Sequence, residues 1–436
     1  MKHFLQWLAL SALLLSSSAL GTGVAGTDAN NNGIRDDVDA YIQADTLSPA
    51  QRTASEEYAR LLQRLVVGTP PVTSTGRDPL LALLESGRPD WADLARELRA
   101  RTVNTGQRLN AYAQALAGAG PRFMPLLPAG SEDCPNGQCT VLIFQNGILN
   151  SEETALKSML ALRRLMGESI GNQRLYYALN YNPTEGLRDV VEVFRQKFGE
   201  QDSGAAVFAA SFGEPSDLSS VATSLLTKKV NAAVKVPTTV TGWLQALSNP
   251  TSVLPQSQNL VPSPTEVSAA LRDYTETYLN SLVQATLRLR DRTSATHYMD
   301  QNALRLTDGV EAYLRQGLHV VLVAHSQGNL YAEVVARELT RRSVPTERFA
   351  VVGISVPNAQ APMGGAYVST QADLILGALR LVFPVLQAND DSVPMGQPGG
   401  AFLGHAFVDV YTNPSYKVSQ KVAEAIRQTV EQVSGR

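Results

Sequence analysis

The residue best suited to do chemistry is Ser326, within the segment 324–328, AHSQG. An apolar run, 319–324, leads into this segment, and a helical pattern follows it directly. The small residues Ala324 and Gly328, two positions before and after the serine, permit a sharp strand-to-helix turn that exposes its hydroxyl, although glycine is more usual than alanine at the first of them. The pattern predicts a serine nucleophile. The plainer interpretation is that Ser326 only caps the helix.

A serine nucleophile needs a base, and elimination among the five histidines selects one candidate. The excluded histidines lie in the N-terminal leader, upstream of the nucleophile, at the start of the strand and in the turn itself: His3, His297, His319 and His325. His405 remains, flanked by Gly404 in a loop before the last helical pattern. A Ser–Asp–His order along the chain places the base there.

The acid that orients the base should lie between the two, at the end of a strand. Asp373 follows the strand-like segment 366–370 and precedes His405 by 32 residues. Its task would be to select the imidazole tautomer and to stabilise the imidazolium ion. Asp390 and Asp391 are the rival candidates, nearer to the histidine but following an apolar run.

An oxyanion hole needs two backbone N–H groups. One is expected from Gln327, the residue after the nucleophile. The other is expected from Ile148, in the loop after the first strand, where Gly147 lets the backbone approach. Asn146-Gly147 is also a common turn sequence, and both interpretations can hold together.

A second candidate site lies near the N-terminus, in the segment 28–39, DANNNGIRDDVD. Counted from its first residue, the oxygen ligands follow the spacing of an EF-hand calcium loop, with glycine at position 6. The six ligand candidates are Asp28, Asn30, Asn32, Ile34 (through its carbonyl), Asp36 and Asp39. Arg35 at position 8 and aspartate rather than glutamate at position 12 depart from that pattern. The spacing predicts a structural Ca²⁺, whereas the plainer interpretation is a polar linker.

The leader indicates the compartment. Residues 1–21 combine a short basic start, an apolar, serine-interrupted run and small residues at the end, which is typical of a cleaved signal peptide. An uncleaved anchor fits less well because the apolar run is short. We therefore expect an exported protein, periplasmic or secreted. In an oxidising compartment, Cys134 and Cys139 of CPNGQC predict a small-loop disulfide. A redox pair would favour the C-x-x-C spacing instead.

Composition narrows the class of protein. The chain has 436 residues, 44% of them hydrophobic, which excludes a disordered or fibrous chain. The net charge is −3, from 37 basic and 40 acidic residues. Without a basic excess, we expect no nucleic-acid partner.

The elements that must position these residues fall into two regions. The region 22–130 carries the calcium-loop candidate and helical patterns, the first opened by a Ser48–Gln51 capping box and the second capped by Asp90. From residue 140, strands alternate with helices, one of which Asn150 and Glu153 are expected to open. This alternation predicts an α/β domain, 131–436, with a mostly parallel sheet flanked by helices. The expected segments are strands at 140–144, 174–181, 319–324, 349–356 and 366–370 and helices at 150–165, 187–198, 329–341 and 418–433.

An insertion of about residues 200–300 interrupts the alternation. Its segment 236–265 has no charged residue and five prolines. Such a stretch must bury against something or meet apolar ligands. It is either a cap or lid over an apolar pocket or an ordinary inserted subdomain.

The order of these parts from about residue 140 onward resembles the α/β-hydrolase superfamily, and AHSQG is similar to the nucleophile turn of bacterial lipases and esterases. Asn146-Gly147 stands where many lipases have His-Gly, and the N-terminal helices lie outside the resemblance. The resemblance implies acyl transfer to water: Ser326 attacks, His405 moves the proton and Asp373 orients. It implies no metal or organic cofactor for catalysis.

Two functions from different classes follow. The first is an exported carboxylic-ester hydrolase acting on a small-molecule or lipid ester, which contacts a lipid interface through the lid if it is lipase-like. A thioesterase, an amidase or a polyester depolymerase would use the same residues. The second is a non-catalytic, calcium-stabilised surface or binding protein on a hydrolase scaffold. The survival of nucleophile, acid and base in the right order argues against the second.

Overall fold

The computed structural model describes most of the chain outside the leader and the insertion. Its described residues are 23–68, 78–119, 122–126, 134, 138–147, 151–182, 284, 286–295, 300–380, 384–394 and 404–435. The predicted signal peptide, the helix expected at 187–198, the uncharged segment 236–265 and Ile148 lie outside these residues.

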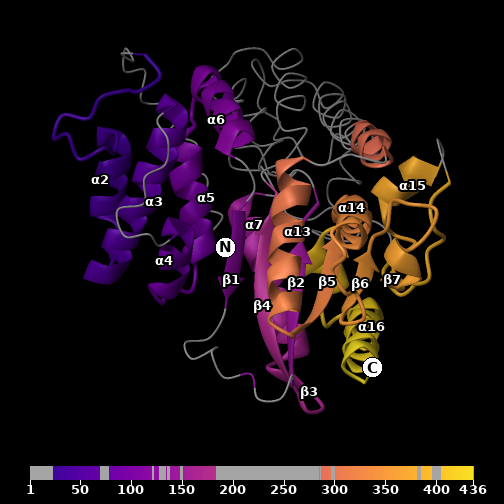
Figure 1. Ribbon diagram of the computed structural model, residues 1–436. Coiled ribbons are helices and arrows are strands. Elements are labelled where there is room, and N and C mark those ends of the chain that lie inside the picture. The colour runs from indigo at the N-terminus through magenta and orange to yellow at the C-terminus, as the bar shows by residue number, and fades with distance from the viewer. Residues whose placement is uncertain are drawn as a thin grey trace, which may run out of the picture.

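The centre of the molecule is a seven-stranded sheet in which six strands follow the order β1-β4-β2-β5-β6-β7, while β3 pairs with β4. β1 and β3 pair antiparallel to β4, and the remaining pairs are parallel. This confirms the predicted mixed α/β fold with a mostly parallel sheet (Figure 1). The strands are β1 (Arg122–Leu126), β2 (Cys139–Gln145), β3 (Ser169–Ile170), β4 (Gln173–Tyr181), β5 (His319–His325), β6 (Phe349–Ile354) and β7 (Ala366–Val368).

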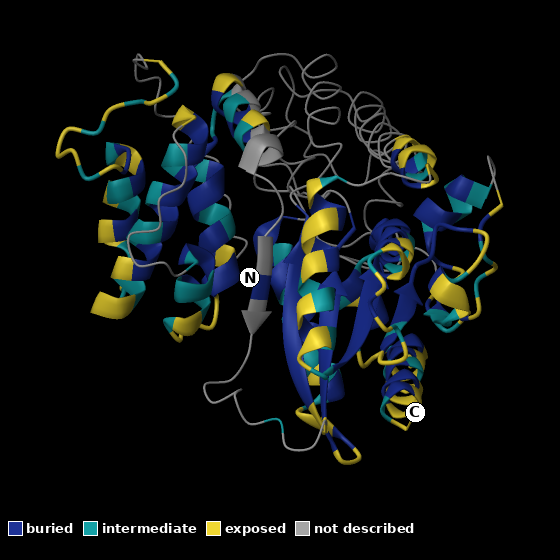
Figure 2. Cartoon of the chain, viewed as in Figure 1, coloured by how far each residue is buried: buried dark blue, intermediate teal, exposed yellow. Residues whose placement is uncertain are grey.

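Helices cover both faces of the sheet. Side chains alternate between faces along a strand, so neighbouring residues of β2 and β5 enter different clusters. Leu142 and Val321 pack with α7 (Glu152–Met166) and α16 (Lys417–Ser434). Their neighbours Val141 and Val320 pack with α13 (Gln301–Arg315) and α14 (Gly328–Arg341). Every residue of β2 and β5 is buried, which explains why both strands are continuous apolar runs (Figure 2).

Within the described residues, five helices precede the sheet in the chain and lie beside its β1 edge (Figure 1). They are α2 (Asp36–Ala44), α3 (Pro49–Val67), α4 (Pro79–Glu85), α5 (Trp91–Thr102) and α6 (Gly106–Ala119). The predicted Ser48–Gln51 capping box is confirmed at the start of α3. Asp90 is the N-cap residue of α5, but its side chain makes no capping hydrogen bond. The apolar residues of these helices join the same cluster as α7 and α16.

The start of α7 differs from the expectation. The N-cap is Ser151, whose hydroxyl accepts a hydrogen bond from the backbone N–H of Thr154 at 3.3 Å. Glu153 lies in the first turn of the helix, as expected, and Asn150 lies outside the described residues. The Glu153 carboxylate pairs with Arg99 of α5, and both side chains are buried. The partner of this carboxylate is thus 54 residues away in the sequence, a contact that local spacing does not predict.

Two further expectations concern covalent structure and membranes. The disulfide between Cys134 and Cys139 is confirmed, and it ties the preceding loop to the first residue of β2. Among the helices that the structure describes, none is both long enough and apolar enough to span a membrane.

The topology places the site at the carboxyl ends of two central strands of the sheet. The chain passes from β2 outward to β4 and then returns to β5 on the other side of β2. The switch point thus lies between β2 and β5, and ligands of open α/β sheets bind at the carboxyl ends of strands at such a point. The residues that follow these two strands are Asn146 and Ser326.

Candidate active site

Ser326 lies at the carboxyl end of β5, between the strand and α14. Its φ is +56°, a left-handed conformation that is uncommon for a residue with a side chain and that turns the chain directly into the helix. The turn is crowded, because a Cβ on Gly328 would lie 2.6 Å from the carbonyl oxygen of Gln145. Ala324, the other small residue of the turn, is fully buried.

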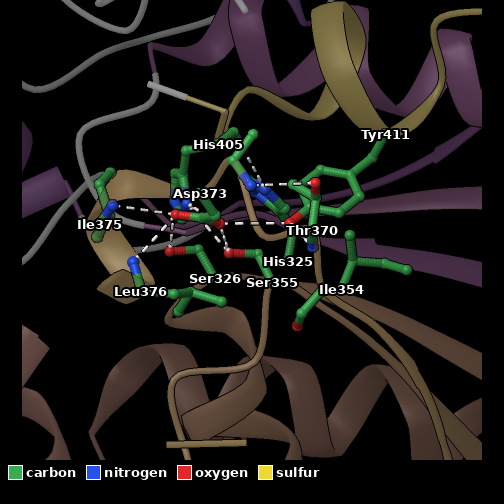
Figure 3. A network of polar contacts seen from close by, with 12 residues as sticks. His325, Ser326, Ile354, Ser355, Thr370, Asp373, Ile375, Leu376, His405 and Tyr411 are labelled. Carbon is green, nitrogen blue, oxygen red and sulfur yellow. Dashed lines mark hydrogen bonds and ion pairs between the residues drawn. The ribbon is translucent and has the colours of Figure 1, made fainter. Parts of the chain in front are cut away.

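The structure brings the three predicted catalytic residues into one chain of hydrogen bonds. Nε2 of His405 lies 2.9 Å from Oγ of Ser326. Nδ1 of the same ring lies 2.9 Å from Oδ2 of Asp373 (Figure 3). The geometry matches the arrangement that activates a serine: a base within reach of the hydroxyl, and an acid that orients the base.

Asp373 is buried and surrounded by donors. Oδ1 accepts the backbone N–H groups of Ile375 and Leu376, at 3.1 and 3.0 Å, in the first turn of α15 (Leu374–Arg380). Burial alone would raise the pKa of the Asp373 carboxyl. The neighbouring His405, whose ring also donates a hydrogen bond, and further hydrogen bonds from Ser355 and Leu376 outweigh burial, so the pKa lies below its ordinary value. The carboxylate is therefore held ionised.

The surroundings of Asp373 also select the tautomer of His405. The hydroxyls of Ser355 and Tyr411 donate to Oδ2 of Asp373 at 2.6 and 3.3 Å. The Ser355 oxygen lies 3.0 Å from Nδ1 of His405, so that nitrogen faces two oxygens, one of them a carboxylate. The proton accordingly belongs on Nδ1. Nε2 is left as the acceptor that a serine base requires.

The loop that carries the base lies directly against the loop that carries the acid. Gly404 has a φ of +64°, and a Cβ on it would lie 2.0 Å from the carbonyl oxygen of Ala372. Only glycine fits this contact without moving one of the loops. Gly404 therefore brings His405 within hydrogen-bonding distance of Asp373.

A contact of His325 was missed by sequence reasoning, which placed this residue only in the turn beside the nucleophile. Nε2 of His325 lies 2.9 Å from the backbone carbonyl oxygen of His405, a contact in which the imidazole must be the donor. Burial, and then the nearby His405, lower the pKa of His325 to about 3, so the ring stays neutral. No local sequence signal identifies a contact between residues 80 positions apart.

The predicted oxyanion donors are placed in part. Gln327 is the N-cap residue of α14, next to Ser326, and Ile148 lies outside the described residues. Gly147 approaches closely, because a Cβ on it would lie 2.8 Å from Cβ of Ser326. The Asn146 amide donates to the carbonyl oxygen of Gly147 at 2.6 Å and accepts the Asn182 N–H at 2.9 Å. These bonds fix the backbone that faces the serine.

The rival acids lie elsewhere. The Asp390 carboxylate accepts hydrogen bonds from the Ser392 hydroxyl and N–H and forms an ion pair with Lys421 at 2.9 Å. Asp391 is exposed. The structure thus brings Asp373, rather than either rival, to His405.

Four of the six residues of the calcium-loop candidate, Asp28, Asn30, Asn32 and Ile34, lie in the turn before α2, and Asp36 and Asp39 lie in the first turn of that helix. Asp28 accepts the backbone N–H groups of Asn32 and Gly33, and Asp39 accepts the side-chain amides of Asn30 and Asn32. Within the described part of the chain, no group of three or more His, Cys, Asp or Glu side chains is placed to hold a metal ion. The bound Ca²⁺ thus stays a prediction of the spacing.

Comparison of the chain with protein-family models, curated proteins and solved structures finds no match. The functional assignment therefore depends on the geometry and chemistry of the site itself.

Proposed function

We propose that this protein is a serine hydrolase that cleaves carboxylic esters, with the site organisation of an α/β-hydrolase. The observation that carries the proposal is the continuous hydrogen-bonded chain from Ser326 through His405 to Asp373. It stands at the switch point of a mostly parallel sheet, where such folds bind their ligands. The serine has the strained backbone expected of a nucleophile at a strand-to-helix turn.

The chemistry follows from the roles that the geometry allows. Ser326 Oγ attacks the ester carbonyl carbon while Nε2 of His405 takes its proton, and Asp373 stabilises the resulting imidazolium. The carbonyl oxygen becomes an oxyanion, for which the backbone N–H of Gln327 is the nearest expected donor. Collapse of this tetrahedral intermediate releases the alcohol, which takes the proton from His405, and leaves an acyl-serine. His405 then takes a proton from a water molecule that attacks the acyl-serine. The imidazolium returns this proton to Ser326 Oγ as the carbon–oxygen bond breaks, which releases the carboxylic acid and restores the free enzyme.

The predicted export is part of the proposal. The disulfide supports it, because disulfides persist in oxidising compartments. The proposed substrate is a lipid ester or a small-molecule ester. The same three residues could also cleave thioesters, amides and polyesters.

The test is labelling by a fluorophosphonate probe, with wild type and Ser326→Ala compared side by side. The expected result is labelling of wild type that is lost in the variant. A series of p-nitrophenyl esters of increasing chain length then separates an esterase from a lipase. Folded wild-type protein that resists the probe and hydrolyses no ester would reject the proposal and favour the non-catalytic binding protein.

A further inference from the structure

The hydroxyl of Ser326 has two hydrogen-bond partners in the free protein. One is Nε2 of His405, at 2.9 Å. The other is the side-chain amide oxygen of Gln327, to which the hydroxyl donates at 3.1 Å. A serine hydroxyl has one proton, and the amide oxygen only accepts. While that proton points to Gln327, it is not directed at Nε2 of His405, so the two arrangements compete.

The amide oxygen of Gln327 lies beside Gly147, on the side where the second oxyanion donor is expected. A Cβ on Gly147 would lie 3.0 Å from this oxygen and 3.2 Å from Ser326 Oγ, so both atoms border Gly147. The Gln327 side chain is buried, with 2% of its surface exposed. An ester carbonyl oxygen approaching Ser326 must enter the same corner, between the Gly147 backbone and the start of α14. The carbonyl of Gln327 thus stands where an ester carbonyl would stand.

A third residue holds Gln327 in this position. Its Nε2 donates a hydrogen bond to the hydroxyl of Thr286, which is fully buried. Thr286 belongs to the helical segment 286–293. Leu289 of this segment is buried in the hydrophobic cluster that contains apolar residues of α13 and α14. The amide is therefore fixed at its nitrogen end by Thr286 while its oxygen end faces Ser326.

We propose that the Gln327 amide is an internal stand-in for the substrate carbonyl, held by Thr286, which restrains the nucleophile until an ester displaces it. On displacement the Ser326 proton turns to Nε2 of His405 and the corner becomes available to the ester oxygen. Thr286 is then a positioning residue that acts through Gln327. This inference rests on the proposed function, because it concerns the reactivity of the same serine.

The experiment compares the rate of fluorophosphonate labelling of wild type with that of Thr286→Val, which keeps the shape of the side chain and removes its hydroxyl. Losing one neutral hydrogen bond should free the amide and raise the second-order rate constant about two- to tenfold. Thr286→Ala is a second hydroxyl-free variant, and Thr286→Ser should restore the wild-type rate. Thr293→Val is the matched control, since its hydroxyl bonds only to the Arg290 carbonyl within the same helical segment.

The outcomes separate the two proposals. Faster labelling in both hydroxyl-free variants, with Thr286→Ser and Thr293→Val at the wild-type rate, supports the stand-in. Labelling of both hydroxyl-free variants at or below the wild-type rate overturns it and leaves the proposed function intact. If the probe labels neither wild type nor any variant, the proposed function fails and the inference fails with it.

Discussion

Nε2 of His325 donates a hydrogen bond to the backbone carbonyl oxygen of His405, so the residue before the nucleophile holds the backbone of the base. The two rings lie 5.1 Å apart between centroids, and His325 also packs against Phe407 and Tyr411. The same turn that carries Ser326 therefore sets the position of His405. The distance between Ser326 and His405 therefore depends on the side chain of His325.

Replacing His325 by phenylalanine keeps an aromatic ring among these neighbours and removes the donor. We expect kcat for a p-nitrophenyl ester to fall about tenfold or more with little change in KM, because small displacements of a catalytic group are costly. His325→Gln retains a side-chain N–H and should lose less. Steady-state kinetics of the three proteins makes the comparison. Equal kcat values in wild type and His325→Phe would show that the contact does not position the base.

The same histidine should make stability depend on pH. Burial lowers its folded-state pKa to about 3, whereas in the unfolded chain it is about 6.5. Between these values the unfolded chain binds a proton that the folded protein does not. The free energy of unfolding should therefore fall by about 1.4 kcal/mol per pH unit on acidification below about pH 6.5.

Urea unfolding of wild type and His325→Gln from pH 7.5 to pH 4.5 measures this contribution as a difference in slope. His319, whose pKa is also lowered, titrates in both proteins and cancels. Parallel pH profiles for the two proteins would mean that His325 becomes protonated in the folded state.

We expect activity to require glycine at position 404 because of its close contact with Ala372, and Gly364 serves as a control that has a similar φ without such a contact. Gly404 and Gly364 have nearly the same φ, +64° and +66°, so alanine at either costs about 1 kcal/mol of backbone strain. A Cβ on Gly404 would also lie 2.0 Å from the carbonyl oxygen of Ala372, whereas nothing lies within 4 Å of one on Gly364. We expect Gly404→Ala to lose at least 100-fold in kcat/KM. Gly364→Ala should stay within about threefold of wild type, and comparable losses in both would assign the effect to φ alone.

The choice between the acid candidates can be made by two asparagine substitutions. Asp373→Asn removes the charge that stabilises the imidazolium and places an amide among five donors, so kcat should fall about 10³- to 10⁴-fold. Asp390→Asn should keep kcat within about threefold, since its carboxylate faces Ser392 and Lys421. A larger loss in Asp390→Asn than in Asp373→Asn would reverse the assignment.

Local patterns account for what the sequence could predict. β2 and β5 are buried on both faces and are therefore recognisable as apolar runs, and the Ser48–Gln51 capping box joins residues three positions apart. The turn around Ser326 is a local motif as well. β1 was not predicted, because it is a short edge strand that contains Pro125 and pairs with β4 across 51 to 59 residues.

The remaining contacts of the site join distant parts of the chain. Ser355 and Tyr411 reach Asp373, His325 reaches His405 and Gln327 reaches Thr286, over separations of 18 to 80 residues. None of these pairs has a spacing rule, since each depends on how the loops at the carboxyl ends of the strands meet. Sequence reasoning can thus select the reacting groups, whereas the groups that orient them emerge only from the fold.

The buried pair of Arg99 and Glu153 joins the N-terminal helices to α7, with side chains 1% and 3% exposed. Glu153→Ala removes from the buried Arg99 guanidinium the carboxylate with which it is paired, so this substitution should lower the free energy of unfolding by about 3–5 kcal/mol. Glu424→Ala is the control, because Glu424 forms an exposed pair with Arg427 and should change stability by less than about 1 kcal/mol. Replacing Arg99 by Met and Glu153 by Leu together removes both buried charges, and should restore more than half of the lost free energy of unfolding. Urea unfolding of the four proteins measures each value, and a Glu153→Ala effect no larger than that of Glu424→Ala would mean that solvent reaches this pair.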